Sequence, residues 1–409
     1  MIGSVPQDRV KPPDVPGLCT LLAQCDRDGS AVLVQGADTL RGMGFPPRRA
    51  DVILAMTGLD RIVAHEAADL TCAVQAGVTL ASLAERLAER GQFVPIDAPR
   101  RRAATLGGTL AAGWLGPRRH LYGRPRDFVI GSHAVLADGT LAHAGGMVVK
   151  NVTGYDMSKL YIGSFGTLAV LAQLNLKTIP QPASARVILA KLPERTRSRT
   201  IAAVHALPVV PAVFLCVEGF RKAVDGEDGV DGRIFMLFEG SQALVDRATR
   251  DVRSALGKAG VPEATIVDTG ARESFDRALD ATIANVAERS VTYRSLGTPA
   301  TAEPRALAMR DLANRHELFT DVLIDPLNGD VFVRVSERDT RAFASRIETF
   351  DDAVHEAEPR AVVVAGDAPM RGSLRVWGEE PAALVKMRAI KARFDPHGTL
   401  NPGRYVAGI

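Results

Sequence analysis

The chain has 409 residues, which exceeds the size at which one hydrophobic core usually stops growing, so two domains are expected. Hydrophobic residues make up 46% and charged residues 24%, which is typical of a folded globular protein and excludes a disordered or fibrous chain. The net charge of +3 gives no argument for binding nucleic acid or a membrane surface.

The first part of the chain alternates short helices and strands. A helix is expected from Val15, because Leu18, Leu21, Leu22 and Cys25 fall on one face and Asp28-Gly29 ends the pattern. Asp138-Gly139 predicts the turn of a hairpin between residues 134 and 144. Further strands are predicted over 31–34, 51–56 and 70–75, and a helix over 79–90.

After Pro180 and Pro182 the glycine-rich loops give way to longer elements, which indicates a domain boundary. No internal repeat is evident, and the stretch 297–304 is expected to be less ordered. Strands are predicted over 213–218 and 233–239, with helices over 242–259 and 381–394. The expected domains are 1–182, 183–375 and a C-terminal segment, 376–409.

The four cysteines show neither a CxxC pair nor the spacing of an iron–sulfur or zinc site, so free thiols are expected. The N-terminus has no apolar stretch typical of a signal peptide, and no other run approaches membrane-spanning length. A cytoplasmic protein is therefore expected, in contact with a membrane only through partners.

Several common catalytic patterns are absent from the sequence. Gly42-x-Gly44 lacks the third glycine of a dinucleotide fingerprint, and nothing matches a Walker loop, a Gly-x-Ser-x-Gly elbow or a His-Glu-x-x-His helix. Four stretches rich in small residues stand out instead, and we interpret each as lying at a strand end. Small residues let backbone N–H groups approach phosphate oxygens, which favours a diphosphate cofactor, although any one stretch can simply form a turn. The stretches are 35–39, 105–113, 151–156 and 163–168.

The order and spacing of five motifs resemble the FAD domain of the vanillyl-alcohol-oxidase and p-cresol-methylhydroxylase family. The segment 387–404 resembles the C-terminal signature of that family's lactate and glycolate dehydrogenase branch. The resemblance implies an α+β fold, with a PCMH-type FAD-binding domain of two α/β subdomains. It also implies a second domain with an antiparallel sheet flanked by helices, and a C-terminal segment that returns to the flavin. The motifs are Ala104–Gly108, Arg124–Gly131, Leu136–Thr140, Lys150–Asp156 and Ile162–Leu168.

The resemblance also implies where FAD binds. It puts the pyrophosphate against 35–39 and 105–108, the isoalloxazine near 151–156 and Asn401, and the adenosine end near 163–170. The cofactor-binding residues implied in this way are Gln35, Gly36, Ala37, Asp38, Thr39, Ala104, Thr105, Leu106, Gly107, Gly108, Ala112, Gly113, Arg118, Asn151, Gly154, Tyr155, Asp156, Gly163, Ser164, Gly166, Thr167, Leu168, Val170 and Asn401.

Two departures from the family pattern limit what can be carried over. Covalent members attach FAD through His, Cys or Tyr, and the stretch 35–45 contains none of these, so noncovalent FAD is expected. The larger catalytic relatives carry a histidine-containing segment whose equivalent here, 325–330, has no histidine. No metal ligand and no catalytic residue are therefore assigned.

Within the family, Gly116–Arg119 and Gly145–Asn151 are most similar to FAD-binding subunits of glycolate-oxidase-type 2-hydroxy-acid dehydrogenase complexes. This implies a larger FAD-containing catalytic subunit and an iron–sulfur subunit as partners, with electrons passed to the iron–sulfur subunit. One alternative is a self-sufficient dehydrogenase for D-lactate or glycolate, in which Arg118 or Arg119 clamps the substrate carboxylate. A second alternative is a noncatalytic scaffold that binds FAD.

Overall fold

The computed structural model describes residues 8–148, 154–219, 232–261, 264–267, 271–281, 290–337 and 340–409. Contacts divide the chain into two compact units. The first combines Met1–Gly116, Arg124–Gln181 and Glu380–Ile409, and the second combines Pro117–Gly123 with Pro182–Glu379. The short segment Pro117–Gly123 thus folds with the second unit, which a single boundary near Pro182 does not anticipate.

The first unit contains a parallel sheet in the order β1-β3-β2 and an antiparallel sheet in the order β4-β5-β9-β7-β8. A small antiparallel pair joins β6 and β10. The helices and strands are β1 (Asp8–Val10), α1 (Val15–Arg27), β2 (Val32–Gln35), β3 (Val52–Ala55), β4 (Ile62–Glu66), β5 (Thr71–Gln75), α2 (Leu80–Ala88), β6 (Gln92–Phe93), α3 (Leu106–Ala111), β7 (Val129–Val135), β8 (Leu141–Gly145), α5 (Ser158–Tyr161), β9 (Val170–Lys177), β10 (Ile179–Pro180) and α12 (Leu384–Phe394).

Helix α1 shows how the local sequence builds this core. The side chain of Asp14 caps its N-terminus by accepting from the Gly17 N–H (2.7 Å), and Gly29 follows its end with a φ of +65°. Leu18 and Leu22 are fully buried against the strands, so the expected apolar face is confirmed. The hairpin of β7 and β8 is confirmed as well, because Gly139 takes a φ of +84° at its turn.

The C-terminal segment joins the parallel sheet. The N–H of Val32 donates to the Thr399 carbonyl (2.7 Å), and the N–H of Asn401 donates to the Val32 carbonyl (2.9 Å). Leu400 between them is fully buried in the same core as β2 and α1. Residues 399–401, near the end of the chain, therefore extend the sheet β1-β3-β2, which lies near its start.

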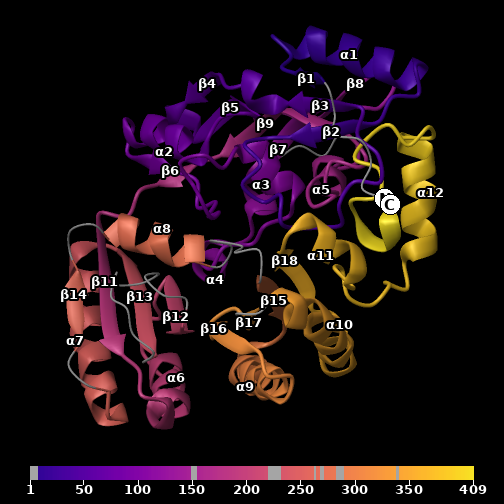
Figure 1. Cartoon of the computed structure of the whole chain (residues 1–409). Coiled ribbons are helices and arrows are strands. Elements are labelled where there is room, and N and C mark those ends of the chain that lie inside the picture. Colours follow the sequence, from indigo (N-terminus) through magenta and orange to yellow (C-terminus); the bar gives the residue numbers. More distant parts are fainter. Residues whose placement is uncertain are drawn as a thin grey trace. The chain divides into compact units, whose positions relative to one another are not determined.

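The second unit is built on one antiparallel sheet of eight strands among its described residues, in the order β14-β11-β13-β12-β16-β17-β15-β18. Helices α6 and α7 pack together beside β11 and β13, and α9 packs on β16 and β17 next to α10 (Figure 1). In the described part of the chain, no helix combines the length and apolarity needed to cross a membrane. The elements are α4 (Arg119–Tyr122), β11 (Ser184–Lys191), α6 (Arg197–His205), β12 (Val213–Glu218), β13 (Arg233–Gly240), α7 (Gln242–Ala259), β14 (Thr265–Val267), α8 (Ala271–Ala281), β15 (Ser290–Leu296), α9 (Pro299–Arg315), β16 (Phe319–Asp325), β17 (Asp330–Ser336), α10 (Thr340–Ala357), β18 (Val362–Ala365) and α11 (Ala368–Ser373).

This sheet is a structural repeat. The order β11-α6-β12-β13-α7-β14 recurs as β15-α9-β16-β17-α10-β18, and the strand order of one half mirrors that of the other. Each half is a β-α-β-β-α-β unit, and the halves meet where β12 pairs with β16. The expectation of no internal repeat is therefore wrong at the level of topology. The same topology needs only matching apolar patterns, so it leaves no repeated residue string in the sequence.

Helix α9 corrects a second expectation. Residues 297–304 are expected to be less ordered, but Pro299 begins the helix. Proline suits the first helical position, where its missing N–H would have no partner within the helix. Pro304 lies inside the helix, which persists because Ala306 and Met309 are buried on the face packed against β16 and β17.

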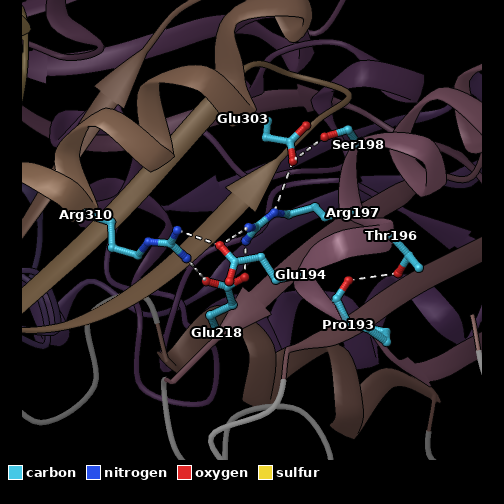
Figure 2. Close-up of polar contacts among 8 residues, drawn as sticks. All are labelled: Pro193, Glu194, Thr196, Arg197, Ser198, Glu218, Glu303 and Arg310. Atoms are coloured by element: carbon cyan, nitrogen blue, oxygen red, sulfur yellow. Dashed lines mark hydrogen bonds and ion pairs between the residues drawn. The ribbon is translucent and has the colours of Figure 1, made fainter.

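An ion-pair network spans both repeats of the second unit (Figure 2). Arg197, at the start of α6, has a side chain only 2% exposed and contacts Glu194, Glu218 on β12 and Glu303 on α9. Arg310 on α9 reaches back to Glu194 (2.6 Å) and Glu218 (3.3 Å). The network therefore ties α6 and β12 of one repeat to α9 of the other, beside a short ladder between β12 and β16.

Candidate functional site

A cleft of about 890 Å³, partly open to solvent, lies within the first unit. It is formed by the loop after β2, the start of α3, the turn before β9 and the C-terminal segment. Its lining is mostly small or apolar: Leu33, Val34, Gln35, Gly36, Ala37, Asp38, Thr39, Leu40, Arg41, Met56, Ala76, Thr105, Gly107, Gly108, Ala111, Ala112, Phe165, Gly166, Ala169, Val170, Leu171, Asn401 and Arg404.

The first predicted stretch, 35–39, lines this cleft throughout and does follow a strand, β2. Asp38 takes a φ of 60°, a left-handed conformation that Asp tolerates better than most residues. A Cβ atom added to Gly36 would collide with the Thr105 hydroxyl. The first loop therefore packs directly on the Thr105 side chain, with no room for a larger residue at Gly36.

The second predicted stretch is not a loop at a strand end, which corrects our interpretation. Thr105 is the N-cap of α3, and its hydroxyl accepts from the Gly108 N–H (3.2 Å). An added Cβ on Gly107 would lie 2.6 Å from the Ala76 Cβ and 2.9 Å from its carbonyl oxygen, whereas one on Gly108 would lie 2.8 Å from the Thr105 hydroxyl. Gly107 thus packs on a neighbouring backbone, whereas Gly108, which also lines the cleft, meets only the end of a side chain.

The other predicted residues around α3 occupy different positions. Ala112 lines the cleft, while Ala104 and Leu106 are buried beside the lining without belonging to it. Gly113 has a φ of +65°, and its added Cβ would lie 3.0 Å from the Gly163 Cα. Gly113 therefore allows α3 to meet the turn at 163–168.

The predicted stretch 163–168 precedes a strand, β9, and divides between two cavities. Gly166 lines the cleft, as does Val170 in β9, together with Phe165, whose φ is 58°. The remaining predicted residues line a neighbouring cavity of about 490 Å³ with apolar residues of α12 and the C-terminus; they are Gly163, Ser164, Thr167 and Leu168. The Ser164 and Thr167 hydroxyls donate to nearby carbonyls, so they shape the turn.

Asn401 connects two walls of the cleft. Its side-chain oxygen accepts from the Val34 N–H (2.8 Å), and its amide nitrogen donates to the Phe165 carbonyl (2.7 Å). These partners lie 367 and 236 residues away in sequence. Asn401 lines the cleft, and its amide joins two of the segments that form it.

Sequence reasoning missed the charged residues of the lining apart from Asp38. Arg404 is buried against the Phe165 ring, 5.6 Å from its centroid, and donates to the Met43 carbonyl (3.1 Å). Burial lowers the pKa of the Arg404 guanidinium, and the charge of Asp38 opposes that change. Arg41 lies at the open side, 80% exposed. Arg404 is the last residue of the C-terminal motif 387–404, so that motif could have indicated that Arg404 belongs to the site.

The predicted residues around 151–156 fall outside this lining. Asn151 lies outside the described residues. Gly154 has a φ of +78°, Tyr155 is 90% exposed, and Asp156 pairs with Lys159 (3.0 Å). The segment is thus at the surface of the first unit.

Arg118, predicted to contact the cofactor, folds with the second unit and is not part of the cleft lining. Its guanidinium pairs with Glu239 (3.1 Å), which also accepts from the Tyr122 hydroxyl (3.0 Å). Arg119 pairs with Asp330 (2.6 Å). Both arginines proposed as a carboxylate clamp are therefore engaged by carboxylates of this chain.

The segment 325–330 is the tight turn between β16 and β17. Asp330 accepts from Arg119 and Arg294, and Asp325 accepts from the Asn328 side chain (2.7 Å). Burial and the nearby Asp330 carboxylate raise the pKa of Asp325 to about 7. Among the described residues no group of three or more His, Cys, Asp or Glu side chains could hold a metal ion.

The lining of the cleft is mostly small or apolar and includes Gly36 and Gly108. The described lining contains no His, Cys or Tyr to which a flavin could be attached. Consistent with this, residues 6–145 match the family model of an FAD binding domain.

Known proteins with similar sequences include two subunits of glycolate oxidase. The glycolate oxidase subunit GlcD of Bacillus subtilis is 24% identical over 99% of this chain and 90% of its own length. The glycolate oxidase subunit GlcE of Escherichia coli is 34% identical, over 39% of this chain and 45% of its own length. Among solved structures, p-cresol methylhydroxylase with bound substrate superposes with a TM-score of 0.74 at 16% identity, covering 97% of this chain and 88% of that one.

The α+β fold is thus that of the PCMH-type FAD-binding proteins, as expected. Together with the FAD-binding family match, it defines the chain as an FAD-dependent oxidoreductase. Within this class the chain is similar to the subunits of glycolate oxidase.

Proposed function

We propose that FAD lies in the cleft of the first unit, with its diphosphate against Gln35–Thr39 and Thr105–Gly108. The observation that carries this proposal is the close packing of Gly36 on the Thr105 side chain at the start of α3. It brings the loop 35–39 and the start of α3 together in the lining of the cleft and leaves no room for a larger residue at Gly36. The adenosine end then follows Gly166–Val170, and the isoalloxazine lies on the Asn401 side. When bound, the flavin supplies the redox chemistry, and the chain supplies binding and orientation.

The FAD is proposed to be noncovalent. Acid precipitation of the purified yellow protein should leave the flavin in the supernatant, because the described cleft lining has no residue of the kinds that attach flavin. Flavin that stays in the pellet would contradict the noncovalent assignment.

We further propose that the chain is the FAD-binding subunit of a glycolate-oxidase-type complex that oxidises a small 2-hydroxy acid. Its partners would be a larger FAD-containing catalytic subunit and an iron–sulfur subunit that receives the electrons. A separate electron carrier is needed because the cysteines of this chain do not suit a cluster. Burial raises the pKa of the Cys72 thiol to about 12, and also raises the pKa of Cys216, which disfavours the thiolate that a cluster requires.

The engaged arginines argue against a self-sufficient dehydrogenase. A substrate carboxylate at Arg118 or Arg119 would have to displace Glu239 or Asp330, both of which are themselves buried carboxylates. A displaced carboxylate left buried without its partner costs several kcal/mol. The chain alone is therefore expected to bind FAD but to hold substrate poorly.

Anaerobic stopped flow tests this division of labour. The isolated chain, loaded with FAD, should show slow or no flavin bleaching with glycolate or D-lactate, and turnover should appear when the larger flavin subunit and the iron–sulfur subunit are added. Rapid bleaching in the isolated chain would establish the self-sufficient enzyme instead. Flavin that neither light with a photoreductant nor the partner subunits can reduce would establish a noncatalytic scaffold.

A further inference from the structure

The turn before β9 is held in an unfavourable backbone conformation where it borders the cleft. Phe165 and Gly166 have φ values of 58° and 67°, both in the left-handed region. That region is unfavourable for a bulky residue such as Phe, so surrounding contacts must hold the turn. An added Cβ on Gly166 would lie 2.8 Å from the Asn401 amide nitrogen, which shows how closely the C-terminal segment fits against it.

Lys391 of α12 provides one set of those contacts. Its ammonium donates to the carbonyls of Thr167 (2.8 Å) and Leu400 (3.0 Å) and to the Asp395 carboxylate. Asp395 in turn accepts from the N–H groups of Thr399 and Leu400, each at 2.8 Å. Lys391 therefore joins the turn to the same C-terminal segment that pairs with β2.

Asn401 and its neighbours provide the other set. The Asn401 amide bridges the end of β2 and the Phe165 carbonyl, as described above. The Phe165 ring stacks on Tyr405 (centroids 6.0 Å apart, 21° between the planes), and the Arg404 guanidinium lies over the same ring. The C-terminal segment thus contacts Phe165 twice. Asn401 binds the backbone carbonyl of Phe165, and Arg404 and Tyr405 contact its ring.

We propose that Lys391, Asp395 and Asn401 form a C-terminal clasp that holds the turn Phe165–Gly166 in the shape that FAD binding requires. They are positioning residues for the cofactor, because Phe165 and Gly166 line the cleft and the clasp acts on them. The inference rests on the proposed place of FAD in this cleft. A clasp of this kind makes cofactor affinity depend on residues more than 200 positions from the turn in sequence.

A purely structural role for these residues makes a different prediction. It lowers the stability of the FAD-free and FAD-bound proteins equally, so the FAD dissociation constant does not change. A positioning role raises the dissociation constant and shrinks the gain in melting temperature on adding FAD, because that gain depends on affinity. The two roles are therefore separable by comparing both forms of each variant.

The experiment uses the full chain with FAD as the probe, in the variants Lys391→Met and Asn401→Gly. Glycine at 401 accepts the φ of 44° found there, so this variant removes the amide bridge without adding backbone strain. The matched control is Lys177→Met, which removes a lysine of the same unit whose ammonium lies 5.1 Å from the Phe128 ring centroid. FAD affinity is read from quenching of flavin and tryptophan fluorescence, and melting is followed with and without FAD.

Each clasp variant should raise the FAD dissociation constant about 10-fold or more and blur the shoulders of the visible flavin spectrum, with the control within about 2-fold of wild type. Unchanged affinity in both clasp variants, whatever their melting temperatures, would overturn the clasp. Asn401 also lines the cleft, so Lys391→Met, which changes no residue of the lining, decides between the two roles. If Lys391→Met does not fold, Asp395→Asn, which weakens the same contact, takes its place. Failure of the wild-type chain to bind FAD would count against the proposed function. That outcome is distinguishable from failure of the clasp, in which wild type and clasp variants bind FAD equally well.

Discussion

The cleft of the first unit and the ion-pair networks of the second unit are built in opposite ways. The lining of the cleft is mostly small or apolar, includes Gly36 and Gly108, and carries few charges. The second unit instead places buried charges opposite one another, as Arg197 does with Glu218 and Glu303 (Figure 2). The first arrangement leaves backbone groups available for a ligand, whereas the second uses its charges to hold the fold.

This difference bears on where function can be sought. A buried arginine suggests an anion site when it is met in sequence, yet Arg118, Arg119 and Arg197 all contact carboxylates of the same unit. Buried charges without partners are costly, so most are paired within the fold. In this chain the glycine pattern was therefore the better guide to a ligand than the arginine clusters.

The largest effect is expected from breaking the network in Figure 2. Arg197→Met should lower the free energy of unfolding of the second unit by about 3–5 kcal/mol, because it leaves buried carboxylates without their partner. Arg310→Met should cost less, since Arg310 is 24% exposed. Each unit has one of the chain's two tryptophans, so urea unfolding can be followed separately through Trp377 in a Trp114→Phe background. Equal losses for both variants would show that burial at Arg197 is unimportant.

A comparison of neighbouring glycines tests the cleft. Gly108→Val should raise the FAD dissociation constant about 100-fold, or about 2.7 kcal/mol, and cost less folding stability than Gly107→Val, because Gly108 lines the cleft and its added Cβ meets only the Thr105 hydroxyl. Gly107→Val should instead lower the melting temperature of the FAD-free protein, because its side chain meets Ala76. FAD titration and thermal melts of the two variants distinguish these effects. Full FAD affinity in Gly108→Val would remove the phosphate role from this segment.

The smallest effect concerns pH and Asp325. Its pKa of about 7 in the folded protein lies above the ordinary value, so the folded state holds a proton that the unfolded state releases. The stability that this proton contributes is present at low pH and is lost as pH rises through 7, by about 1.4 kcal/mol between pH 6 and pH 8. The groups facing Asp325 are Asp330, Arg119 and Asn328.

Asp325→Asn should remove this pH-dependent part. The difference in unfolding free energy between the variant and wild type, followed through Trp377, should shift in favour of the variant as pH rises from 6 to 8. A constant offset across that range is expected from the altered contact with Asn328 and does not bear on the titration. A difference that stays constant and shows no shift would rule out the raised pKa of Asp325.

Much of the fold followed from local pattern. The apolar face of α1, the turn at Gly139 and the full length of α7 depend on residues close together in sequence, and each was predicted within a residue or two. The prediction of a less ordered stretch at 297–304 was wrong, because the burial of Ala306 and Met309 against the sheet outweighs the cost of Pro304 within α9. The repeat in the second unit was invisible, because topology constrains polarity pattern and not residue identity.

The candidate site divides in the same way. The sequence by itself determined the small-residue stretches after β2 and at Thr105–Gly108, because a close backbone approach needs glycine wherever the loops lie. Only the tertiary structure decided that Gly107 serves packing, that Arg118 folds with the second unit and that Lys391 reaches Thr167. The roles of Gly107, Arg118 and Lys391 depend on which parts of the chain, distant in sequence, lie beside each residue. Long-range hydrogen bonds and ion pairs produce no periodic pattern in the sequence, so these roles could not be predicted from it.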